Sequence, residues 1–217
     1  MTGALLLPDA EALGDLETFT GRAHRVDPDG AARLVASGEV LAVYASPVHG
    51  GDGPVVLGLR VLGLAEPAAL DVTVPLTALL DRFGRARQSA SGPFPLSVPP
   101  GRATEAWAGV APPRSGWDAD GLLDAAVLRS AAEAGIRQIA DGVPPGAGAQ
   151  AVAQLRGRVW GRPLAPELPD VPAGIAFAAD ALGFLDDAEP VALYRRPPWV
   201  RATTRRGHVL ARRPALL

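Results

Sequence analysis

The chain has 217 residues, a formal net charge of −2 at pH 7 and no cysteine. This length suits one large domain or two small ones, and about 70% of the unfolded chain's surface can be buried without a disulfide or a metal as a staple. The lack of Cys excludes thiol catalysis, thiolate zinc sites and iron–sulfur clusters. Lys is absent as well, so all 21 Lys or Arg positions are Arg, which excludes a P-loop lysine and a Schiff base.

Two helices are expected before the first strand. Residues 15–26 place apolar side chains at helical spacing, with Asp15 as the predicted N-cap. Residues 31–37 are predicted to form a short second helix, which Gly38 would end.

The stretch from Glu39 to Leu64 predicts a central β-hairpin. Two apolar runs rich in β-branched residues, 39–46 and 55–64, flank a segment of Gly and Pro. Because both alternating faces of each run are largely apolar, we expect this hairpin to be covered on both sides. A third strand over 70–74 and a helix that Pro75 opens are expected to follow.

The rest of the chain is expected to be helical and then to end in strands. Residues 88–102 are rich in Ser, Gly and Pro and predict a long connection. Helices are predicted from the Asp124 cap to about residue 140, over 149–160 and over 173–185. Three short strands, 191–195, 199–203 and 208–212, are predicted to form a C-terminal meander.

This order of elements indicates an α+β fold. Its antiparallel sheet elements are the central hairpin 39–64 and the C-terminal three-stranded meander, and Ala-rich helices cover them. We expect an N-terminal half of residues 1–87, a connection over 88–111 and a second half of residues 112–217, either as separate parts or as one continuous domain.

Positive charge is concentrated at the C-terminal end. Seven Arg and no acidic residue follow Glu189, whereas residues 1–189 hold 14 Arg and all 23 acidic residues. With a short turn at Thr204–Gly207, strand alternation places Val200, Ala202, Val209 and Ala211 on an apolar face. The opposite face then carries Trp199, Arg201, Thr203, His208, Leu210 and Arg212.

We interpret the chain as a non-enzymatic binding or protein-interaction module that uses this Arg-rich meander. The predicted partner-binding residues are Trp199, Arg201, Arg205, Arg206, His208 and Arg212, and the expected partner is an acidic protein surface or another protein that the sequence does not identify. A nucleic acid is the first alternative, because Arg can bind phosphates while Trp199 or His208 stacks on unpaired bases. A plainer interpretation is that these Arg residues are solvated or neutralise the acidic remainder of the same chain. Homodimerisation through sheet edges or Ala-rich helices also stays open.

A small hydrolase-like enzyme is the second alternative. His49 lies in a Gly-rich loop near Ser46 and Asp52, so a base, a nucleophile and an orienting carboxylate could converge there. No Gly-x-Ser-x-Gly motif is present, and a loop His beside Gly is typical of a turn. The three His residues show no metal-ligand spacing, so we predict neither a metal nor a cofactor.

The N-terminal segment is a poor signal peptide. Residues 1–9 have no positive region and only a short apolar run before Pro8. The apolar run from Ala173 to Leu182 is interrupted by Asp180 and is shorter than the ~18 residues of a membrane span. We therefore expect a cytoplasmic protein without a membrane partner.

Three motifs carry a resemblance to a known group of proteins. They are Arg114-Ser115-Gly116-Trp117, the segment 177–184, and Trp199-Val200-Arg201 followed by Arg206-Gly207-His208-Val209. Together they resemble a family of uncharacterised proteins from high-GC actinobacteria, mainly over residues 112–213. The resemblance implies a soluble cytoplasmic protein and no assigned activity, so it transfers no catalytic residue.

Overall fold

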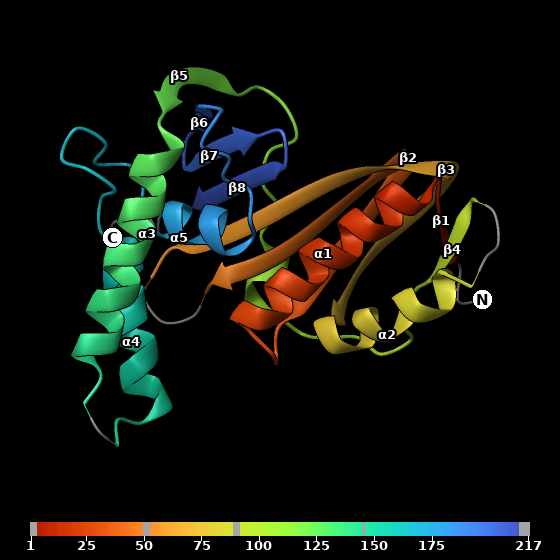
Figure 1. Cartoon of the computed structure of the whole chain (residues 1–217), viewed down its shortest axis with the longest axis horizontal. Coiled ribbons are helices and arrows are strands. Elements are labelled where there is room, and N and C mark those ends of the chain that lie inside the picture. The colour runs from red at the N-terminus through yellow and green to blue at the C-terminus, as the bar shows by residue number, and fades with distance from the viewer. Residues whose placement is uncertain (1–3, 50–52, 89–91, 145, 213–217) are drawn as a thin grey trace. The chain divides into compact units, whose positions relative to one another are not determined.

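A computed structural model describes residues 4–49, 53–88, 92–144 and 146–212 of the chain (Figure 1). The chain forms two compact units. Unit 1 comprises Met1–Ser46 and Leu59–Val110, and unit 2 comprises Pro47–Gly58 and Ala111–Leu217. Helices and antiparallel strands occur in both, which confirms the predicted α+β class.

Two long strands, β2 (Ala31–Val48) and β3 (Val55–Pro75), form the hairpin. The prediction of a helix over 31–37 is wrong, because these residues are the first part of β2. Ala32, Leu34 and Ala36 are buried on one side of the strand, which is the two-residue period of a sheet. Gly38 lies inside β2 with φ +61° instead of ending a helix, and the predicted third strand over 70–74 is the end of β3.

The prediction that the hairpin is covered on both faces holds only near its tip. Every residue of 45–48 and 56–58 is buried. Farther from the tip burial alternates, and Val40 and Val61 are 50% and 42% exposed. The sequence could not show this difference, because the same apolar side chains occur on solvent-exposed and on buried faces of a strand.

Unit 1 buries its core beneath two helices, α1 (Ala10–Val26) and α2 (Leu76–Ala86). Leu13, Leu16 and Phe19 of α1 and Leu79 and Phe83 of α2 are buried. The start predicted for α2 is confirmed. The N-cap of α1 is Asp9 rather than Asp15, because the Asp9 carboxylate accepts a hydrogen bond from the backbone N–H of Ala12 at 2.7 Å.

Unit 1 also contains three short elements that the sequence did not predict. Strand β1 (Ala4–Leu7) pairs antiparallel with β4 (Phe94–Ser97), which lies within the predicted connection. A 3₁₀ turn, η1 (Ala106–Gly109), buries Trp107. These elements are only four residues long, so neither helical nor strand periodicity could identify them.

The C-terminal meander in unit 2 is formed as predicted. Its strands are β6 (Val191–Arg196), β7 (Trp199–Thr204) and β8 (Gly207–Arg212), all antiparallel. A fourth strand that the sequence did not predict, β5 (Asp118–Leu123), pairs with β6. The order of the six-stranded sheet is β2-β3-β8-β7-β6-β5.

Three helices complete unit 2: α3 (Ala125–Gly142), α4 (Ala149–Gly161) and α5 (Gly174–Ala181). Asp124 caps α3 by accepting a hydrogen bond from the N–H of Ala126 at 2.8 Å, as predicted. Helix α5 is shorter than the predicted range 173–185. Its first turn packs closely on α4, and the rings of Trp160 and Phe177 stack with centroids 4.6 Å apart.

Candidate binding surface on the C-terminal meander

The turn between β7 and β8 has the length that puts the predicted apolar residues of both strands on the same face of the sheet. Thr204 pairs with Gly207, so Arg205 and Arg206 form a two-residue connection between β7 and β8. Val200, Ala202, Val209 and Ala211 are all buried. The inner face predicted by strand alternation is therefore confirmed.

The opposite face is less open than the sequence indicates. Trp199 is only 5% exposed, and Leu210 is buried as well. Large apolar side chains gain free energy when they leave water, even when their strand neighbours are charged. Trp199 therefore has no free ring face on which a nucleic-acid base could stack, which corrects the role that the nucleic-acid alternative gave it.

Two Arg residues at the end of β6 hold the segment that leads into β5. Arg195 donates to the carboxylates of Asp120 and Asp170. Arg196 donates to the backbone carbonyl of Ser115. Arg195 and Arg196 thus bind groups of their own chain, and these contacts restrain residues 115–120.

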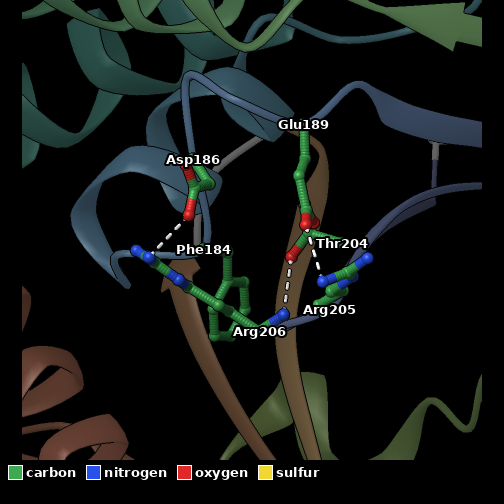
Figure 2. Close-up of a pocket in the computed structure, with 6 residues that line it drawn as sticks. All are labelled: Phe184, Asp186, Glu189, Thr204, Arg205 and Arg206. Atoms are coloured by element: carbon green, nitrogen blue, oxygen red, sulfur yellow. Dashed lines mark hydrogen bonds and ion pairs between the residues drawn. The ribbon is translucent and has the colours of Figure 1, made fainter.

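The two Arg residues of the turn border a small pocket of about 140 Å³ (Figure 2). Arg205 Nη1 lies 2.9 Å from a carboxylate oxygen of Glu189. Arg206 Nη2 donates to Asp186 at 2.7 Å, and the Arg206 backbone N–H donates to Thr204 Oγ1 at 3.1 Å. The ring of Phe184 also lines the pocket, so an aromatic surface lies beside two ion pairs.

These ion pairs neutralise part of the positive charge that the sequence shows at the C-terminal end. Acidic residues from before the meander pair with Arg195, Arg205 and Arg206. This is the arrangement in which the meander neutralises part of the acidic remainder of the chain. Arg205 still keeps a side chain that is 86% exposed, so its guanidinium stays accessible beside Glu189.

Arg201 lies in a different environment. Its Cζ atom is 4.6 Å from the ring centroid of Trp117 and 4.5 Å from that of Tyr194. Its Nε atom is buried and has no hydrogen-bond partner among the described residues. Burial lowers the pKa of Arg201, because removal from water disfavours the charged form.

The other two predicted binding residues of this face are His208 and Arg212. His208 lies across the strands from Thr203, and its Nδ1 atom is 3.0 Å from Thr203 Oγ1. Arg212 is exposed at the end of β8, paired in register with Trp199. Neither contributes to the pocket at the turn.

The residues of the hydrolase alternative are not arranged as a catalytic group in the described part of the chain. Ser46 lies within β2 and is 6% exposed, so its hydroxyl is poorly placed to attack a substrate. His49 is exposed just beyond the end of β2. Asp52 lies outside the described residues.

Among the described residues, no group of three or more His, Cys, Asp or Glu side chains could hold a metal ion. In the same ranges, no helix combines the length and the apolar character needed to cross a bilayer.

The sequence did not reveal the partners of these Arg residues. Trp117, Tyr194 and the acidic groups that pair with the meander come from segments that only folding brings together. A weak signal was present, because Trp117 belongs to one of the motifs that carried the resemblance.

Comparison with known proteins finds a match to a different family model for each half of the chain. Residues 1–108 match the model "Domain of unknown function (DUF8010)", and residues 112–216 match the model "Domain of unknown function (DUF8185)". No curated protein matches the chain.

Among solved structures, the chain is similar to a crystal structure of the DNA polymerase sliding clamp from Pseudomonas aeruginosa with ligand. The sequences are 14% identical and the TM-score is 0.46. The similarity covers 94% of this chain and 64% of the clamp chain, so the chain spans about 64% of the clamp's length.

Proposed function

We propose that this chain is a non-enzymatic protein-interaction module whose contact surface includes the turn between β7 and β8. The observation that carries the proposal is the exposed Arg205 at a pocket that the Phe184 ring lines. Arg residues and aromatic rings are enriched where protein interfaces concentrate their binding free energy.

The ion pairs at the pocket favour a partner with acidic side chains. An exposed ion pair contributes only about 0–1 kcal/mol, so Arg205 can exchange Glu189 for a partner's carboxylate at little cost. Arg206 is less exposed, at 54% against 86% for Arg205, and it contacts Asp186 and donates to the Leu185 carbonyl at 3.4 Å. We therefore assign the exchangeable contact to Arg205 and the supporting one to Arg206.

A charge-reversal experiment tests this surface. Tagged wild-type protein is cross-linked in cells of its source, the captured partner is identified, and the complex is rebuilt from purified components. We expect the double variant Arg205→Glu, Arg206→Glu to weaken the complex at least about tenfold, because two attractive contacts become repulsive. Its thermal midpoint should stay close to that of the wild type.

The matched control is the double variant Arg137→Glu, Arg158→Glu. It makes the same change of charge on exposed helical positions of α3 and α4. Equal binding by both double variants would show that the turn is the wrong surface. A captured nucleic acid whose affinity falls steeply with salt would replace the protein-partner proposal.

The remaining expectations belong to the same proposal. They are a cytoplasmic location, an actinobacterial source, homodimerisation, and the division into residues 1–87, 88–111 and 112–217. Native mass spectrometry of the purified chain tests homodimerisation, because the spectrum reports the subunit number, and it also reports any bound mass. A discrete added small-molecule mass would count against a pure protein-interaction module.

A further inference from the structure

The proposed function does not explain the position of Arg201 on the meander. Among the described residues, Arg195, Arg205 and Arg206 each contact a carboxylate, whereas no ion pair joins Arg201 to one and its buried Nε atom has no hydrogen-bond partner. Its contacts are the rings of Trp117 and Tyr194. We call Trp117, Tyr194 and Arg201 the aromatic clamp.

The clamp is held in place before any partner arrives. Tyr194 is the cross-strand neighbour of Arg201 in the pairing of β6 with β7. Trp117 is fixed because its indole N–H donates to the Pro113 carbonyl at 3.1 Å. The contact of Arg196 with the Ser115 carbonyl restrains the same segment.

Gly116 explains why the chain can pass so close to β6. It has φ +73°, a conformation that favours glycine. A β-carbon at Gly116 would also collide with the Arg196 guanidinium. The sequence Ser115-Gly116-Trp117 is thus suited to placing an indole ring over Arg201.

A guanidinium in this state is suited to receive a carboxylate. Cation–π contacts orient it, but they leave its hydrogen-bond donors unused. Burial lowers the pKa of Arg201, because the partly buried guanidinium loses hydration, and Tyr194 offsets this only in part. A carboxylate can bind an Arg fork through two parallel hydrogen bonds, and partial burial strengthens such bonds.

Apolar surface adjoins the clamp. Leu122 of β5 is 67% exposed and pairs in register with Ala192, which lies two residues from Tyr194 and hence on the same face of β6. A partner could therefore place an acidic side chain at Arg201 and an apolar side chain against Leu122.

We propose that the aromatic clamp is a preformed site for a carboxylate side chain of an acidic protein partner, with Arg201 as the anchor. This inference rests on the proposed function, because it supplies a second contact for the same kind of partner. The occupant is chosen by charge complementarity: Arg201 is half-buried and no ion pair joins it to an acidic group among the described residues, whereas Arg212 of the same face is exposed to water.

The test is an NMR titration of the full chain with a hexaglutamate peptide at constant ionic strength. The side-chain Nε–Hε signal of Arg201 is the readout, assigned from its loss in Arg201→Lys. The titration is run in the Arg205→Glu, Arg206→Glu background, so binding at the turn cannot produce the shift. Hexaglutamine is the uncharged control peptide.

We expect a saturable shift of the Arg201 signal with hexaglutamate and none with hexaglutamine. Arg201→Lys keeps the charge but loses the fork, so the affinity should fall at least about fivefold. Arg137→Lys makes the same change at an exposed position of α3 and should bind within twofold of the parent, which makes it the matched control. Persistence of the shift in the charge-reversed turn would support the clamp even if the proposed turn surface failed.

Other outcomes would overturn the inference. One is an Arg201 signal that hexaglutamate leaves unmoved, and another is equal affinity in Arg201→Lys. An equal shift with inorganic phosphate would indicate a general anion site, and a shift on dilution without peptide would indicate a second copy of the chain. If Arg201→Lys fails to fold, the Arg201 signal is assigned instead by through-bond correlation to its own backbone, and the titration stays decisive.

Discussion

Gly135 of α3 leaves the ring of Trp160 the space that a β-carbon would occupy. A β-carbon built on Gly135 would lie 2.2 Å from Cζ3 and 2.5 Å from Cη2 of Trp160. The ring cannot easily move away, because it is buried and stacks on Phe177 of α5 with an interplanar angle of 15°. This one glycine therefore sets how closely α3 approaches α4.

We predict that Gly135→Ala destabilises the protein. Overpacking of a buried contact costs about 1–3 kcal/mol, which exceeds the ~1 kcal/mol that Ala gains over Gly in a helix. Urea denaturation followed by tryptophan fluorescence checks the free energy of unfolding. An unchanged or higher midpoint would show that the helices separate without strain.

Gly21→Ala in α1 should have the opposite effect. No atom lies within 4 Å of a β-carbon at Gly21, and the residue lies inside a regular helix. The substitution should raise stability by about 0.4–1 kcal/mol, because Ala loses less backbone entropy on folding. Thermal and urea unfolding of Gly21→Ala and Gly135→Ala measure how the same substitution changes stability where the β-carbon has space and where it meets another side chain.

Asp9→Ala should cost about 1 kcal/mol, because Asp9 provides the N-cap of α1. Asp15→Ala is the comparison, since Asp15 is the cap that the sequence predicted. Asp15 instead accepts a hydrogen bond from the Arg60 side chain, and both side chains are partly exposed. A loss of helix stability in Asp15→Ala but none in Asp9→Ala, measured by circular dichroism during unfolding, would contradict the structure.

Arg33→Lys should lower stability by about 1–2 kcal/mol, although the charge is kept. Arg33 donates from Nε and Nη2 to the two carboxylate oxygens of Asp71, each at 2.8 Å, and from Nη1 to the Ala108 carbonyl at 2.6 Å. The hydrogen bonds to Asp71 raise the pKa of Arg33 above its ordinary value. An ammonium group cannot reproduce this fork.

The control for Arg33 is Arg85→Lys, on an exposed position near the end of α2. It should change the unfolding midpoint very little. An equal loss of stability in both variants would show that the paired hydrogen bonds from Arg33 to Asp71 add nothing to the general effect of replacing Arg with Lys.

Gly207→Ala should lower the thermal midpoint and disturb the pocket at the turn. Gly207 has φ +155°, and a β-carbon there would lie 2.6 Å from Cζ of Phe184. Strain and the collision together should cost about 1–3 kcal/mol. Gly63→Ala in β3, where no atom lies within 4 Å, is the strand control and should be close to neutral. An unaltered midpoint in Gly207→Ala would mean that Phe184 moves freely in the pocket.

Some elements could be predicted because their signal is local. The cap at Asp124, the helices over 149–160 and from Pro75 onward, and the three closing strands all follow from side-chain spacing and from nearby Gly and Pro. The buried set Val200, Ala202, Val209 and Ala211 also followed, since a two-residue turn and strand alternation determine it. These features depend on neighbours within a few residues.

The sequence by itself determined that the chain is an α+β protein without Cys or Lys, and that its Arg residues gather at the C-terminal end. It could not decide residues 31–37, where a short run of Ala, Leu and Val fits a helix or a strand until a sheet buries one side. Only the tertiary structure paired Arg195, Arg205 and Arg206 with carboxylates and left Arg201 between Trp117 and Tyr194. The physical reason is that charge pairing and aromatic contact depend on which distant segments lie side by side, and Trp117 is 84 residues from Arg201 in the chain.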